Sequence, residues 1–178
     1  MALPNFPLKP EYLHILINPV PVYGLGLGAG LLLFALLLKS KQACATAILL
    51  IFIGASSAWP VVEIGETAYD RTQTVADTDG GAWLEEHEHR GKQSLPFFLA
   101  LAGVAALAFI AQFNSRKLVT FNKFAVPLAL ITLVGALAMF GVSGYVAYAG
   151  GKVMHKELRE KNKAPPVRPE EAHGKDAD

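Results

Sequence analysis

The sequence predicts an all-α fold, an integral membrane four-helix bundle whose two termini lie on the same side of the bilayer. Hydrophobic residues make up 52% of the 178 residues, which is a high share for a soluble protein. They are concentrated in four long runs, and about 20 apolar residues in a row can cross a bilayer as a helix. Because the number of spans is even, the chain ends on the side where it began. The length indicates a single domain.

The positions of these runs predict the spans and their flanking segments. The spans are expected at residues 13–38, 43–62, 95–113 and 126–150. They belong to a membrane domain of residues 13–157, which is preceded by a proline-rich lead-in of residues 1–12 and followed by a charged, proline-containing flexible tail of residues 158–178. Trp59-Pro60 marks the end of the second span, since tryptophan favours the membrane boundary and proline interrupts a helix.

Several glycines are expected to have a structural role. The first span carries Gly24, Gly26, Gly28 and Gly30. They form two overlapping small-x-x-x-small pairs, a spacing that lets two helix backbones approach closely in a membrane. Gly65 is expected as turn material, and Gly150-Gly151 is expected to bend or end the fourth helix.

A long polar segment, residues 63–94, is predicted to connect the second span to the third. Between residues 63 and 92 it holds eight carboxylates and three basic residues, a net charge of −5. Four spans place this segment on the same side of the membrane as both termini. Such a negative field attracts cations or a basic partner, whereas the simplest interpretation is a solvated acidic surface.

Four histidines are expected to meet at this polar face, because each lies near a span end on that side. They are His14, His87, His89 and His155. A b-type haem needs two axial nitrogens from facing helices. The pair His14 and His155 is the first choice, with either of the other two as a substitute. Arg90 and Lys152 are candidates for the haem propionates. Alternatively, the histidines are ordinary polar residues of the headgroup region.

Two pairs of side chains in the polar segment have a spacing that suits metal ligands. Glu63 and Glu66 are three residues apart, as are Glu86 and His89, so each pair would share one face of a helix. A Glu-x-x-His pair also occurs in carboxylate-bridged dimetal bundles. A divalent metal ion is therefore the alternative to haem, and a solvated acidic loop is the alternative to both.

Several functions are disfavoured by what the chain lacks. The spans have no Asp, Glu, Lys, Arg or His near mid-bilayer, which argues against an ion or proton transporter. The net charge of +1 provides no basic field for nucleic acid. The single cysteine, Cys44, excludes an internal disulfide and covalent haem attachment through Cys-x-x-Cys-His. No catalytic residue is predicted, so an enzyme is less expected than an electron-transfer or accessory protein.

The basic residues around the first span predict its orientation. Lys39 and Lys41 follow this span and Lys9 precedes it. Positive charge favours the cytoplasmic side, and the first span usually dominates. The polar face is therefore expected on the periplasmic side of a bacterial inner membrane. The total of Lys and Arg, eleven on the polar face against five on the other, favours the reverse.

Three motifs of the chain resemble those of a family of bacterial four-span membrane proteins of unknown function. Members begin the first span with a pattern like His-Pro-x-x-x-His-Phe-Pro; here His14 is followed by Asn18-Pro19, and the second histidine is missing. Members carry histidines before the third span, as at residues 86–90, and end the fourth with a glycine pair and a histidine, as at residues 150–155. The resemblance implies a membrane location and a histidine site for haem or metal.

Two functions remain open at this point. The first is a small electron-transfer or redox-accessory protein in the lipid bilayer, with a haem or metal site at its polar face and a soluble electron carrier as partner. The second is a non-catalytic subunit that packs into a larger membrane complex through its glycine-rich first span and docks a soluble partner on its acidic segment.

Overall fold

The computed structural model describes residues 9–112 and 123–159. The helices are α1 (Pro10–Ile17), α2 (Pro19–Leu37), α3 (Lys41–Ser56), α4 (Ala58–Val75), α5 (Thr78–Gln112) and α7 (Ala125–Met154), followed by the short 3-10 helix η2 (Lys156–Leu158). The described residues include no strand. Most of the predicted lead-in and of the predicted flexible tail lies outside the described residues.

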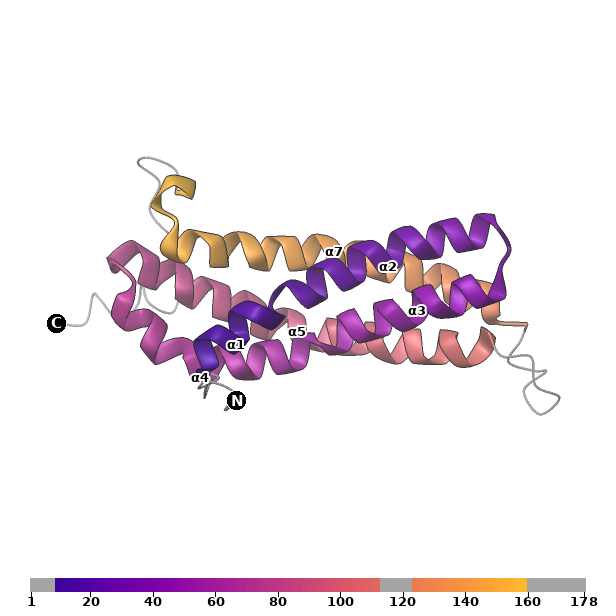
Figure 1. Cartoon of the computed structure of the whole chain (residues 1–178), viewed down its shortest axis with the longest axis horizontal. Helices are drawn as coiled ribbons and strands as arrows, with labels where there is room; N and C mark the ends of the chain where they lie inside the picture. Colours follow the sequence, from indigo (N-terminus) through magenta and orange to yellow (C-terminus); the bar gives the residue numbers. More distant parts are fainter. Residues whose placement is uncertain (1–8, 113–122, 160–178) are drawn as a thin grey trace, which may run out of the picture.

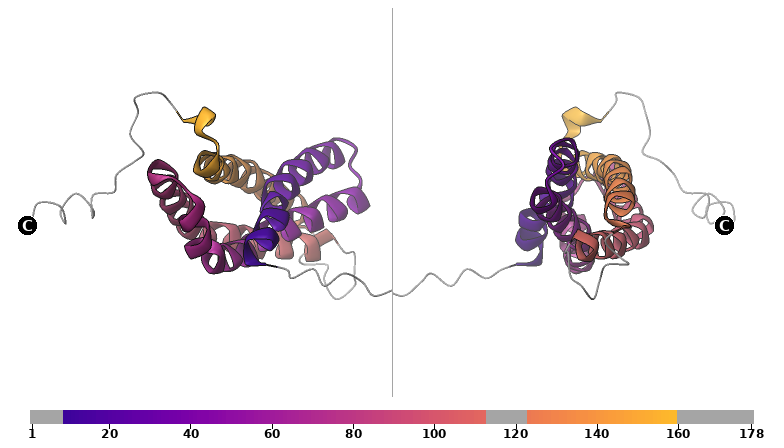
Figure 2. Two further views of the ribbon diagram at one scale, coloured as in Figure 1. Left: turned by 60° about the vertical axis from the view of Figure 1, so that its left-hand side comes forward. Right: turned by 90° about the vertical axis from the view of Figure 1, so that its right-hand side faces the viewer.

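Consecutive helices combine into four columns that are grouped around a common axis (Figures 1 and 2). Each column is long and apolar enough to cross a membrane: Pro10–Leu37, Lys41–Val75, Thr78–Gln112 and Ala125–Met154. The described chain begins and ends in the same half of the bundle, as an even number of spans requires (Figure 1). The prediction of an all-α, four-span membrane bundle is thereby confirmed.

The polar segment of residues 63–94 is itself helical. Helix α4 continues to Val75 and α5 begins at Thr78, so only two residues connect them. The segment is amphipathic, with Ala68, Trp83 and Leu84 buried on its inner side. The bundle therefore has two halves. The membrane half comprises α2, α3, residues 95–112 and residues 125–142. The polar half comprises α1, α4, residues 78–94 and residues 143–154.

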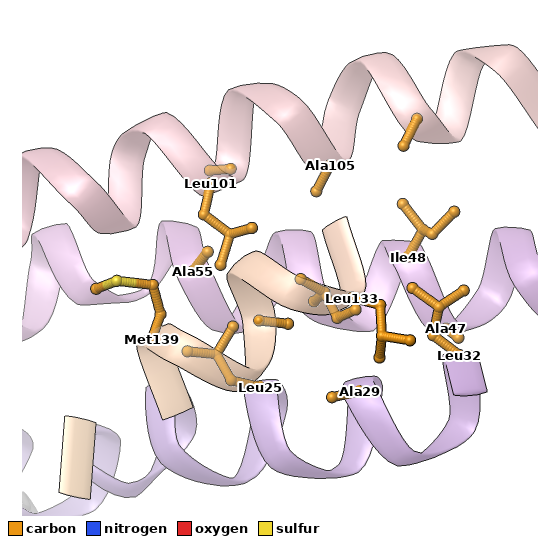
Figure 3. Close-up of a cluster of buried hydrophobic side chains, with 14 of the residues drawn as sticks. Leu25, Ala29, Leu32, Ala47, Ile48, Ala55, Leu101, Ala105, Leu133 and Met139 are labelled. Atoms are coloured by element: carbon orange, nitrogen blue, oxygen red, sulfur yellow. The ribbon is translucent and has the colours of Figure 1, made fainter. Parts of the chain in front are cut away.

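Small residues dominate the core of the membrane half (Figure 3). Alanines from all four columns are fully buried there, packed around Leu25, Leu32, Ile48 and Ile51. Small side chains let helix axes come close, and membrane helices depend on such packing because lipid offers little hydrophobic driving force between them. Large apolar side chains of the same helices point outward, as a lipid-facing surface requires.

The close helix contact predicted along the first span lies between α2 and α3. A Cβ atom on Gly24 would lie 2.7 Å from the Cα of Gly54, and Gly28 also packs directly on α3. Gly26 packs against α7, whereas a Cβ atom added at Gly30 would meet no atom of another helix within 4 Å. Three of the four glycines are thus used inside the fold, which weighs against their use in packing into a larger complex.

Gly24→Ala is expected to lower the free energy of unfolding by about 1–3 kcal/mol, the usual cost of overpacking. The new methyl group would meet the backbone of Gly54, which cannot rotate away. Gly30→Ala is the matched control, because it makes the same change on the same helix in open space. Denaturant-induced unfolding in detergent micelles measures the difference. Equal stability of the two variants would mean that α2 and α3 are not in backbone contact.

A clasp joins the end of α7 to the turn between α4 and α5. The Arg159 guanidinium lies 2.9 Å from the carboxylate of Asp77, and its other nitrogens donate to the carbonyls of Lys152 and Val153 at 2.8 and 2.7 Å. Asp77 also accepts from the backbone N–H of Gly80 at 2.8 Å. One arginine therefore satisfies terminal carbonyls of α7 and binds the neighbouring turn.

The clasp is expected to open in acid. The Arg159 guanidinium, the Lys156 ammonium and the Gly80 N–H hold the pKa of the Asp77 carboxyl well below its usual range. The resulting stability is complete above the unfolded pKa of about 3.9 and is lost as the pH falls through the lower folded pKa. We expect the fluorescence of Trp83, read in a Trp59→Phe background, to change below about pH 4. An identical acid transition in Asp77→Asn would refute the assignment.

Candidate functional site

Two of the four predicted histidines meet inside the polar half. His14 of α1 and His87 of α5 have ring centroids 6.1 Å apart, and their planes are inclined at 81°. The structure thus joins His14 to His87, one of the two substitutes, and not to His155, the first choice. Each ring is held by a different further helix, so all four columns contribute to the site.

The His14 ring is held by α4. Its Nδ1 lies 3.0 Å from the carbonyl oxygen of Val61. Since a carbonyl oxygen only accepts hydrogen bonds, Nδ1 is the nitrogen that carries the proton. The ring also packs on Gly65, where a Cβ atom would lie 2.9 Å from the ring's Cε1. A side chain at this position of α4 would displace the ring.

The His87 ring is held by α7 in the same manner. Its Nδ1 donates to the carbonyl oxygen of Val146 at 2.9 Å. The ring packs on Gly150, where a Cβ atom would lie 2.9 Å from Cε1 and 3.0 Å from Nδ1. Gly150 lies inside α7, which continues through both glycines to Met154. The expected helix stop at Gly150-Gly151 was wrong: the helix continues through both residues, and Gly150 makes room for a ring.

Both rings therefore rest on the same arrangement, a valine carbonyl with a glycine four residues later. We call each such pair a histidine seat: Val61 with Gly65, and Val146 with Gly150. Residues i and i+4 lie on one face of a helix, so the valine carbonyl and the glycine contact the same ring. Each imidazole is fixed in position and tautomer, with Nε2 left as the nitrogen that can bind a metal. Metal-binding histidines are commonly oriented by such a second hydrogen bond.

The spacing of the two rings is one at which a single metal ion could be held between them. An imidazole nitrogen binds a metal at about 2.0–2.1 Å, and the ring centre lies about 1.1 Å behind it, so two rings on opposite sides of one ion have centroids roughly 6 Å apart. A bare metal ion needs more than two protein ligands, and the described residues contain no group of three or more His, Cys, Asp or Glu able to hold one. A haem iron would need only two ligands from the protein, because the porphyrin would supply four nitrogens. His14 and His87 are the two residues that could hold such a group.

The residues predicted to bind a divalent metal do not come together in this arrangement. Glu63 and Glu66 are exposed on the outer side of α4. Glu86 forms an ion pair with Arg90, at 2.7 Å. His89 lies two residues beyond the paired histidine of α5, roughly 200° around the helix from it. The expected i,i+3 pairs lie on helices, but among the described residues neither pair is joined by further ligands into a group of three that could hold a metal ion.

The two predicted propionate partners lie on the α5–α7 side of the site. The Arg90 guanidinium donates to the carbonyl of Tyr145 at 2.9 Å and stands 3.6 Å from the centre of that residue's ring. Lys152 is only 3% exposed. Its ammonium lies 4.2 and 4.3 Å from the ring centres of Trp83 and Tyr148. Cation–π contacts of this kind hold both basic groups beside the seat of the α5 histidine.

His155 lies apart from the pair, directly after the last residue of α7. Its side chain is 62% exposed, and its Nδ1 lies 2.8 Å from the carboxylate of Glu157. The reason for the difference from the prediction is that α7 does not bend back. An exposed histidine paired with a neighbouring carboxylate fits an ordinary surface role.

Sequence reasoning missed the two seats. Gly65 was expected as turn material, yet it lies in the middle of α4. A local signal at both seats is a V-x-x-x-G pattern, at residues 61–65 and 146–150, near the ends of the second and fourth apolar runs; the same pattern also occurs at residues 20–24 and 22–26. Its meaning depends on a histidine from another helix, which a single helix pattern does not reveal.

No family model matches the chain, and the comparisons with curated proteins and with solved structures gave no significant match either. The resemblance to the bacterial four-span family therefore stays a prediction. What the site does has to follow from its own geometry.

Proposed function

We propose that the protein is a membrane electron carrier that binds one b-type haem between His14 and His87. The histidine pair carries this proposal: the ring centroids are 6.1 Å apart, so both rings could hold one iron, and each ring donates its Nδ1 hydrogen to a backbone carbonyl. Ligands from two different columns of a bundle are the usual arrangement for a cofactor held in its core.

When bound, haem supplies a one-electron couple whose potential the axial ligands and their surroundings set. The carbonyls of Val61 and Val146 hold the two imidazoles in one tautomer and make Nε2 more basic. If both histidines held the iron, no ligand position would remain for a substrate, which favours electron transfer over catalysis at the iron. Arg90 and Lys152 are the basic side chains that we assign to the propionates.

The level of the site supports exchange with a partner at the membrane surface. Helix α2 has 19 residues and so spans about 28 Å at 1.5 Å per residue, close to the hydrocarbon thickness of about 30 Å. His14 lies beyond its first residue and therefore beyond the hydrocarbon core. We place this face on the periplasmic side of a bacterial inner membrane, within reach of a soluble electron carrier or of other subunits.

The test is the spectrum of the full-length protein purified from haem-replete membranes. We expect a Soret band, split visible bands on reduction and one haem per chain. Near-perpendicular ligand planes leave the iron orbitals that share the unpaired electron nearly equal in energy. The oxidised protein should therefore give a strongly anisotropic low-spin EPR signal. Absence of a Soret band after titration with added haemin would reject the function.

A further inference from the structure

We infer that α1 is an interfacial membrane helix, whose outer face lies in the lipid headgroup region. The protein buries none of its eight residues. Tyr12, Ile15 and Leu16 are 67%, 68% and 71% exposed. Their spacing places them on one face of the helix, opposite to the side that holds His14. Because the protein does not bury this apolar face, something else must shield it from water.

The contacts of α1 with the protein lie on its inner side and are made mainly with α4. They include the hydrogen bond from His14 to the Val61 carbonyl and an ion pair of 2.6 Å between Glu11 and Arg71 of α4. A helix of this length is not stable in water without packing. Exposing three large apolar side chains to water would add a cost of about 25 cal/mol for each Å². Burial of the outer face in lipid would stabilise the short helix and would keep its apolar side chains out of water.

Continuity with the lipid-facing surface of α2 identifies lipid as the cover. The exposed apolar side chains of α1 continue along α2 at helical spacing, through Val20, Tyr23, Leu27, Leu31 and Phe34. Only Asn18 separates the two helices. Since α2 alone matches the hydrocarbon thickness, α1 lies at the level of the headgroups, where tyrosine is favoured. The Glu11–Arg71 ion pair then marks the water side.

This position brings the histidine pair close to lipid. His14 lies on the inner side of α1, so a single helix separates its ring from the headgroup region, whereas α4 separates it from water. The placement of α1 itself does not depend on any bound cofactor.

Spin labels on single cysteines in a Cys44→Ser background test this placement in the full chain, reconstituted into phosphatidylglycerol–phosphatidylcholine vesicles. Ile15→Cys and Leu16→Cys report on the outer face of α1. Leu27→Cys is the lipid reference, and Gln73→Cys, exposed on α4, is the water reference. We expect the ratio of oxygen relaxation to relaxation by a water-soluble nickel complex to be higher at both α1 labels than at residue 73 and lower than at residue 27.

Labels at residues 15 and 16 that behave like the label at residue 73 would overturn the inference. Dipolar broadening between α1 labels of neighbouring chains would overturn it too, because a second copy would then cover this face. Two labelled positions guard against a single perturbing substitution. Haem content is not part of the readout, so failure of the cofactor proposal and failure of this inference are distinguishable.

Discussion

His87→Ala is expected to abolish haem binding, with a fall in affinity of more than about 100-fold. Loss of a residue that only hydrogen-bonds to a metal ligand commonly costs about 10–100-fold in affinity, and this variant removes the ligand itself. His14→Ala should have the same effect, because both axial positions depend on the pair. The measurement is a haemin titration of the purified variants, followed by the Soret band. Each variant removes one nitrogen donor and leaves a cavity of the size of an imidazole.

The controls for this experiment are the other two predicted histidines. His89→Ala and His155→Ala should bind haem as the wild type does, since neither ring belongs to the pair. Added imidazole should restore the low-spin spectrum of His87→Ala by occupying the cavity, which separates loss of a ligand from misfolding. A wild-type spectrum for His87→Ala, or its loss in His155→Ala, would show that the ligands have been assigned to the wrong residues.

The membrane architecture could be predicted because hydropathy acts through the solvent. Apolar runs of sufficient length partition into lipid whatever their neighbours are. The polar half was harder, since its helices α4 and α5 carry their apolar residues only on an inner face. Ala68 and Trp83 are buried among residues that are mostly charged or polar. When hydropathy is averaged over a window of residues, such a segment has the low value typical of a loop between helices.

The site could be predicted only in part, because a sequence does not give the direction in which a side chain points. The level of His14, His87 and His155 along the bundle followed from their distance to the span ends. Which rings face one another depends on rotation of each helix about its axis. For His87 that rotation brings the ring against Gly150, a contact that links residues 63 positions apart and has no local signal.

The two histidines are held in the same way. Both histidines donate to a valine carbonyl on the next column of the bundle, α1 to α4 and α5 to α7. The pair α1 and α4 therefore holds its histidine in the same way as the pair α5 and α7. For the proposed haem, each pair of columns would supply one histidine held by the same kind of backbone hydrogen bond.

Gly150→Ala is expected to destabilise the protein by about 1–3 kcal/mol through overpacking. The new Cβ atom would lie 2.9 Å from Cε1 of His87, so the ring must move. It cannot move without lengthening its hydrogen bond to Val146, on the same helix. This loss outweighs the gain of roughly 0.5–1 kcal/mol that alanine normally gives over glycine inside a helix.

The matched control is Gly144→Ala, in the same helix, where the added Cβ atom has no neighbour within 4 Å. It should keep the full helix gain of roughly 0.5–1 kcal/mol. Unfolding in detergent micelles measures both variants, and the EPR spectrum of the haem-loaded protein reports the angle between the rings. If the seat of His87 is formed as described, only Gly150→Ala changes that spectrum. Equal stability and equal spectra would mean that the ring does not rest on Gly150, and the fixed geometry on which the haem proposal depends would be lost.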